Sequence, residues 1–357
     1  MNSGTMRSCL AANRVILFVL GFFLSVQGVI VYGQVGAGSS TLPPAPAPPG
    51  SSSLYIQDPY QAPASSGGPL LKNPPSNSFN SLSFGSDEGM KFIQNLGLDV
   101  TWIVSGASKK NMGLFRFDVC LDVPLPYFDN PENSLFFEPR FAMNLFNGPK
   151  GDFDGKYENY TSNEFDVSLG LRWLPKFQLS KMATPLEFDF FFSVGLYTDF
   201  KSVNGNSFRF PSWAYLSLDV TNNIKAKIGV WVLDRVRYTI LPSGGVIWTP
   251  NDRWEFQILF PNPRVTYRPV NPVLKDMSLF ARGEYGGGSW TVHSDIGTFQ
   301  KDYNDYRVLF GFDWRGPANG IGFFEFGGSF GRELYLNKGV GSYHLNPGFI
   351  LQAGLHF

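Results

Sequence analysis

The residues best suited to chemistry in this sequence are its histidines, two of which lie near possible partners. His293 has Ser289 and Ser294 close by in the sequence, and His356 is the residue before the last. A serine activated by a histidine, which a third group orients, is the arrangement of many hydrolases. No nucleophile motif surrounds either histidine, and isolated histidines in strands are usually polar filler. We therefore predict that the protein is not an enzyme.

The cysteines and histidines also fail to form a metal-binding motif. Cys9 lies near the amino terminus, and Cys120 is the only other cysteine. Together with His293, His344 and His356, their spacing fits no metal site. We expect no metal and no cofactor. The formal net charge of +0 gives no reason to expect a nucleic-acid partner.

Opposite charges lie two residues apart at several places, so that both side chains face the same side of a strand. The pairs are Arg116 with Asp118, Glu138 with Arg140, and Arg282 with Glu284. Small residues and paired charges on one face suit a confined polar interior, and the pairs can be pore-lining charges or salt bridges. We predict that these six residues line a lumen. Neutralising Arg282 would then leave Glu284 without a partner.

Apolar residues alternate with small or polar residues along most of the chain after residue 81. The clearest runs are "NEFDVSLGLRWLP" from Asn163, "LEFDFFFSVGLY" from Leu186 and "YRVLFGFDWR" from Tyr306. Runs of about 10 residues match the length of a tilted strand that crosses a bilayer. Phenylalanine alone occurs 35 times, while mean hydropathy is only -0.09, so the apolar residues are dispersed. We predict an all-β fold, a transmembrane antiparallel up-and-down β-barrel, in preference to a soluble β-sandwich.

Turn signals divide the chain into roughly 12–14 strands, and bacterial barrels have even numbers of strands as a rule. We expect long outer loops at Phe146–Asn163, Asp199–Phe210 and Arg332–Pro347, and tight inner turns at Thr221–Asn223, Pro250–Asp252 and Arg315–Gly320. Prolines and the stretch "EYGGGSW" leave Asn262–Ile296 open, either as a turn or as a glycine kink within one strand. Four tryptophans fall beside the expected inner turns: Trp173, Trp248, Trp254 and Trp314. We predict that they form a periplasmic aromatic girdle.

The amino-terminal part indicates export. Arg7 and Arg14 precede an apolar run and then small residues, which is the layout of a signal peptide over residues 1–33. Residues 34–80 are rich in Pro, Ser and Gly and read as a disordered linker. Residues 81–357 are the expected barrel domain. No later segment is long and apolar enough for a membrane helix.

The carboxy terminus carries a resemblance to a known class. The sequence "NPGFILQAGLHF" alternates in polarity and ends on Phe357. It resembles the last strand of Gram-negative outer-membrane β-barrels, and the resemblance implies that Phe357 is an assembly signal read by the barrel-assembly machinery. The block Leu241–Pro269 is similar to an uncharacterised, domain-of-unknown-function family of outer-membrane barrels, which implies location and fold but no activity.

A barrel of this size lies between the filled eight-stranded kind and the open porins. The main hypothesis is therefore a narrow, porin-like pore for small solutes in the cell outer membrane. The inward-facing Phe191 and Phe280 admit partly apolar solutes as well. The alternative is a structural or surface-display barrel without transport, and an outer-membrane hydrolase is a weaker third. Outer-membrane lipid and the assembly machinery are the expected partners, and the solute stays unknown.

Overall fold

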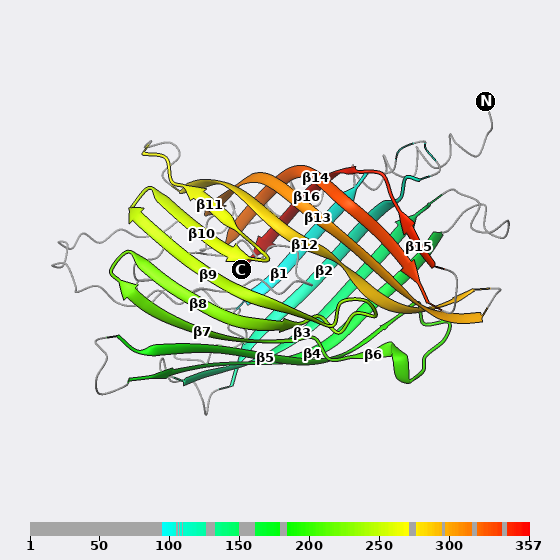
Figure 1. Cartoon of the computed structure of the whole chain (residues 1–357), viewed down its shortest axis with the longest axis horizontal. Coiled ribbons are helices and arrows are strands. Elements are labelled where there is room, and N and C mark those ends of the chain that lie inside the picture. The colour runs from blue at the N-terminus through cyan, green and yellow to red at the C-terminus, as the bar shows by residue number, and fades with distance from the viewer. Residues whose placement is uncertain are drawn as a thin grey trace, which may run out of the picture. The chain divides into compact units, whose positions relative to one another are not determined.

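The computed structural model describes residues 95–104, 106, 108, 110–125, 133–149, 161–178, 184–270, 276–294, 297–315, 320–337 and 341–357. Fourteen strands in this part of the chain make a closed ring (Figure 1), which confirms the all-β up-and-down barrel at the larger of the two expected sizes. In ring order they are β1 (Asn95–Ile103), β2 (Gly113–Pro124), β3 (Asn133–Asn147), β4 (Thr161–Phe177), β5 (Leu186–Thr198), β7 (Ser212–Thr221), β8 (Ile224–Val232), β9 (Ile240–Asn251), β10 (Trp254–Phe260), β11 (Arg264–Tyr267), β12 (Met277–Ser294), β13 (Gly297–Arg315), β14 (Ile321–Leu336) and β16 (Gly348–His356).

The ring closes at β16, which lies between the first strand and β14. Ala353 of β16 is opposite Val100 of β1 on one side and opposite Phe324 of β14 on the other. Every neighbouring pair in the ring is antiparallel. Closure removes the edge strands, and backbone pairing around the ring is what a lipid environment demands.

An even number of antiparallel strands brings the chain back to the end at which it started. We call the end that carries Asn95 and Phe357 the inner end, and the opposite one the outer end. The expected inner turns between β7 and β8 and between β9 and β10 are tight, with two residues between the strands of each pair. The predicted signal peptide (residues 1–33) and linker (residues 34–80) lie outside the described residues, as do large parts of Phe146–Asn163 and Arg315–Gly320.

Two of the expected outer loops contain more regular structure than the sequence indicates. Asp199–Phe210 includes a 3₁₀ turn (Gly205–Ser207) and the whole of β6 (Phe208–Arg209), which pairs with β5. The prediction of a loop from Arg332 is wrong at its start. There β14 runs on to Leu336, and β15 (Gly341–His344) pairs back onto it. The strand continues because its inward side chains have an apolar cluster to pack against, which is described below.

The two faces of the wall differ as the alternation predicts. Leu169, Val308 and Phe310 point outward and are 52%, 47% and 51% exposed, whereas the intervening Ser168 and Leu309 are buried inside. An apolar outer surface on a closed barrel is stable only against lipid. The described residues include no helix that is long and apolar enough to cross a membrane.

The wall is not equally high all the way round. The β10–β11 hairpin is short, and the β12–β13 hairpin beside it is long (Figure 1). The stretch that the sequence leaves open is therefore a kink within one strand, because "EYGGGSW" lies inside β12. Gly287 has a φ of +107° there, a conformation that side chains rarely tolerate.

Candidate functional site

All six charged residues predicted to line the lumen lie on the inward face of the barrel. Arg116 and Asp118 are on β2, Glu138 and Arg140 on β3, and Arg282 and Glu284 on β12, all buried or nearly so. They do not form one site. The structure brings them together as two networks on different walls of the barrel.

The first network is centred on Asp118. Its carboxylate accepts hydrogen bonds from Arg116 Nη2 and from Arg140 Nη2, each at 2.7 Å. The other arm of Arg116 reaches β4, where Nη1 is 2.9 Å from Asp166 Oδ2. Glu138 lies two residues from Arg140 on the same face of β3. The network therefore ties β2, β3 and β4 together along the wall.

The second network is centred on Arg282. Its guanidinium contacts Glu325 at 2.7 Å and Glu284 at 2.6 Å, and donates to Gln352 Oε1 at 2.8 Å. The expectation that Glu284 depends on Arg282 alone is wrong, because Arg307 Nη1 is 2.9 Å from its other oxygen. The residue that depends most on Arg282 is Glu325, whose side chain is 0% exposed.

Further ion pairs follow the same rule of joining strands that are close in the ring. They are Arg172 with Asp189, Lys225 with Glu187, and Arg264 with Asp313. Charges of both signs lie along the wall, and these pairs hold most of those described. Such an interior offers fixed dipoles and ions to a passing solute but no strong preference for one sign.

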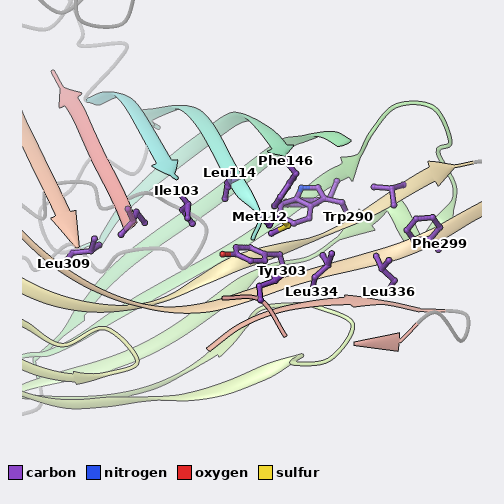
Figure 2. Close-up of a cluster of buried hydrophobic side chains, with 14 residues drawn as sticks. Ile103, Met112, Leu114, Phe146, Trp290, Phe299, Tyr303, Leu309, Leu334 and Leu336 are labelled. Atoms are coloured by element: carbon purple, nitrogen blue, oxygen red, sulfur yellow. The ribbon is translucent and has the colours of Figure 1, made fainter. Parts of the chain in front are cut away.

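The outer part of the interior is apolar instead, which the sequence analysis missed. Figure 2 shows side chains from several strands that point toward one another there. This outer cluster comprises Ile103, Met112, Leu114, Phe146, Tyr197, Trp290, Val292, Phe299, Tyr303, Leu309, Leu334, Leu336, Leu345 and Ile350. The available signal is the sequence "SWTVH", in which Trp290 and Val292 continue the inward face of Arg282 and Glu284 with apolar residues.

Contacts across the barrel accompany the outer cluster. Lys301 of β13 reaches Glu164 of β4, with 2.9 Å between Nζ and Oε1, and both side chains are 0% exposed. Trp290 Nε1 of β12 donates to Asp166 of β4. The end of β5 also meets β12, because Thr198 pairs with Thr291. The outer end is therefore drawn together and filled, whereas the ion pairs described above stay along the wall.

A second apolar group, the side cluster, lies inside the wall formed by β5, β7, β8 and β9. It consists of Phe191, Trp213, Tyr215, Trp231, Leu233 and Tyr285, with Leu241 packed against it. Phe191 faces inward as the sequence analysis assumes, and its ring stacks on Trp213 with 4.0 Å between centroids. Phe280 is buried on the inward face as well.

The four tryptophans of the predicted girdle all lie toward the inner end. Trp173, Trp248 and Trp254 are outward and 40%, 43% and 39% exposed, and Trp314 is half-buried. Each packs near a phenylalanine of the outer surface: Trp173 on Phe190, Trp248 and Trp254 on Phe256, and Trp314 on Phe312. Their role at a membrane interface stays a prediction.

The histidines do not form a hydrolase-like arrangement with the described serines. His293 Nδ1 lies 3.0 Å from Thr298 Oγ1, and the hydroxyl of Ser289 has no hydrogen-bond partner. His356 is buried, with Nε2 3.0 Å from Asp99 Oδ1. Among the described residues, no three His, Cys, Asp or Glu side chains lie close enough to hold a metal ion.

Comparisons with known proteins add little to this geometry. No family model and no curated protein matches the chain. Among solved structures, it is similar to a KdgM porin at 7% identity and a TM-score of 0.31, over 74% of this chain and 98% of that chain. It is also similar to outer membrane phospholipase A from Escherichia coli at 10% identity and a TM-score of 0.32, over 74% and 97% of the two chains. A third similar structure is the Salmonella typhi outer membrane phospholipase dimer with bound calcium. It is 9% identical with a TM-score of 0.32, over 76% of this chain and 94% of that chain.

At TM-scores this low, the likeness carries no argument for a porin or for a phospholipase. The strand register and the two faces of the wall decide the architecture. The architecture is that of an outer-membrane β-barrel. The similarity of Leu241–Pro269 to an uncharacterised barrel family implies no activity, and in the structure this block forms the strands β9, β10 and β11.

Proposed function

We propose that the protein resides in the outer membrane of a Gram-negative cell and passes small solutes through its lumen. The observation that supports this is the inner part of the ring, where ionised side chains such as Arg116, Asp118 and Arg282 are held along the wall. A fourteen-stranded ring is wider than the eight-stranded barrels that side chains fill completely. Ion pairs held along such a wall present fixed charges of both signs to a polar solute.

The pore is closed toward the outside in this conformation. The outer cluster and the Lys301–Glu164 contact lie across the axis between the charged wall and the outer end. Passage therefore requires Trp290, Phe146 and their neighbours to move. We place the resting state of the pore as closed, with the inner end toward the periplasm.

A structural barrel without transport is the second candidate, and one observation favours it. Lys301 and Glu164 form a fully buried cross-barrel pair, which is a feature of a locked interior. A hydrolase is not proposed, because His293 contacts Thr298 and not a described serine.

Single-channel recording in planar bilayers separates the two candidates. We expect the refolded full chain to open rarely and Trp290→Ala to conduct more often and with larger steps, because it removes a ring of the outer cluster and the hydrogen bond to Asp166. The matched control is Trp254→Ala, which removes an outward ring and should leave conductance unchanged. If both variants are folded and silent, the structural barrel is the better description.

We further propose that Phe357 acts as an assembly signal for the barrel-assembly machinery. Its backbone pairs with Leu96, with 3.1 Å for each hydrogen bond, and these bonds do not depend on the side chain. The ring is 37% exposed, so Phe357→Ala should change the free energy of unfolding by only about 0.5 kcal/mol. We expect a manyfold loss of assembled barrel in cells, measured in outer-membrane fractions, but normal refolding into detergent. Equal yields in cells would remove the proposed signal, and Phe357→Tyr, which keeps the ring, is the control.

A further inference from the structure

The backbone wall of the barrel has a gap near its outer end, between β9 and β12. The last pair between β9 and β10 is Gly244 with Phe260, and β9 continues beyond it as Ile240–Ser243. The last pair between β11 and β12 is Arg264 with Arg282, and β12 continues for many residues beyond it. In the part of the chain that the structure describes, no strand pairs with these two continuing edges across the gap, apart from the contact of β12 with the end of β5. Pro242 suits such an edge because it has no N–H to satisfy.

Toward the outer end of the barrel, arginine side chains close the gap in place of a strand. Arg235, from the β8–β9 connection, donates to the carbonyl oxygens of Gly286 and Gly287 at 2.8 and 3.1 Å. Arg209 donates to Ser289 O at 3.0 Å. The unpaired edge of β12 is thus satisfied by buried guanidinium groups, whose release would not break a sheet ladder.

Nearer the inner end of the barrel, the side cluster fills the gap. Tyr285 of β12 is buried among its members, and its ring lies 5.4 Å from that of Tyr306, which is 61% exposed on the outer surface. Tyr238, which is 39% exposed, packs against Tyr285 from the β8–β9 connection at 6.1 Å between centroids. The rings of Tyr306 and Tyr238 therefore lead from the outer surface to Tyr285, which belongs to the same buried cluster as Tyr215 and Trp231.

Two hydrogen-bond donors lie at the side cluster. The indole N–H of Trp231 is buried and has no acceptor among the described residues. Lys227, on the same face of β8, is 5% exposed, and its Nζ lies 4.5 Å from the centroid of the Tyr215 ring. The nearby carboxylates belong to other cations, since Asp189 is held by Arg172 and Glu187 by Lys225. Among the described residues, Lys227 has no carboxylate within ion-pair distance.

We propose that the gap between β9 and β12 is a lateral portal, and that the side cluster with Lys227 is a binding site for an anionic amphiphile. The ammonium of Lys227 would bind a single carboxylate head, and the alkyl chain would lie along Tyr215, Trp231 and Tyr285. A side entrance suits an apolar chain because it leads directly to the side cluster and avoids the ion pairs along the inner wall. This site rests on the proposed pore function and names a solute class for it, a long-chain carboxylate.

The test is the binding of spin-labelled dodecanoate to the full chain in lipid nanodiscs at pH 7, measured as the immobilised fraction by electron spin resonance. We expect a saturable immobilised component in the wild type, and about tenfold weaker binding or more in Lys227→Gln, because one charge-assisted hydrogen bond is lost. Lys227→Arg keeps the charge and should retain most of the binding. Spin-labelled dodecanol, which has no charge, should bind the wild type as weakly as dodecanoate binds Lys227→Gln.

Entry through the wall has a separate readout. Tyr285→Ala removes the ring in the gap, so association of the label should become faster, followed by stopped-flow quenching of tryptophan fluorescence. Phe349→Ala, which removes an exposed outward ring on β16, is the control and should leave the rate unchanged. The binding site is overturned if the wild type does not bind dodecanoate, or if Lys227→Gln binds it equally well. The portal is overturned if the association rate is unchanged in Tyr285→Ala. Potassium chloride conductance tests the pore independently, so a conducting barrel that fails to bind dodecanoate rejects only this inference.

Discussion

Arg282→Met is expected to lower the free energy of unfolding of the barrel by about 3–5 kcal/mol, the cost of leaving a buried charge without its partner. Glu325 loses contacts at 2.7 Å and its side chain is fully buried, so no water replaces the guanidinium. Glu284 is affected less, because it keeps its contact with Arg307. The measurement is urea-induced unfolding in lipid vesicles, followed by tryptophan fluorescence.

The double variant Arg282→Met with Glu325→Leu is the decisive control. Replacing both partners with apolar residues of similar volume removes the unpaired charge, so most of the lost stability should return. The coupling between the two positions follows from the double-mutant cycle. A single variant within about 0.5 kcal/mol of the wild type would mean that the inner wall is well hydrated and the charges are not buried in solution.

Most of the fold could be predicted from alternation alone. Val308 and Phe310 face outward and Arg307 and Leu309 inward because a strand has a period of two, and a closed barrel is the one all-β structure that exposes so much apolar surface to lipid. Tight turns such as Thr221–Asn223 and Pro250–Asp252 limit the count to roughly 12–14 strands, and the structure has fourteen. The same alternation places Arg116, Asp118 and Arg282 on the inward face.

The pairs within one strand, Arg116 with Asp118 and Arg282 with Glu284, were predicted, but the partners on other strands were not. Arg282 also pairs with Glu325, and Arg116 with Asp166, because the ring brings distant parts of the sequence together. The outer cluster was missed for a different reason. Alternation divides residues into two faces, and a face that changes from charged to apolar partway, as β12 does between Glu284 and Trp290, breaks the assumption that each face has one character.

The wall gap illustrates the same limit. The prolines and glycines of "LPSGGV" and "EYGGGSW" mark irregular backbone, and the sequence leaves the second stretch open between a turn and a kink. Only the strand register shows that both stretches border one gap. Gly244 is in the last β9–β10 pair before the gap, and Gly287 lies in β12 on its other side. Two irregular stretches that are far apart in the sequence can be recognised as the borders of one gap only in the closed ring.

The other large effect is expected at the cross-barrel pair. Lys301→Met should cost about 3–5 kcal/mol of unfolding free energy, since Glu164 would remain buried without its cation. The cation also lies 3.3 Å from the centroid of the Phe146 ring, so the substitution removes a cation–π contact as well. Lys301→Met combined with Glu164→Gln should recover much of the loss in the same urea titration.

The pair also tests what closes the outer end. If apolar volume is the barrier, Lys301→Met with Glu164→Gln should stay silent in planar bilayers, because methionine still fills the space beside Phe146 and Trp290. Lys301→Ala with Glu164→Ala removes that volume and should conduct. If the volume-conserving variant conducts as readily as the alanine variant, the ion pair itself is the lock. The outer cluster would then only cover an opening that electrostatic attraction between β4 and β13 keeps shut.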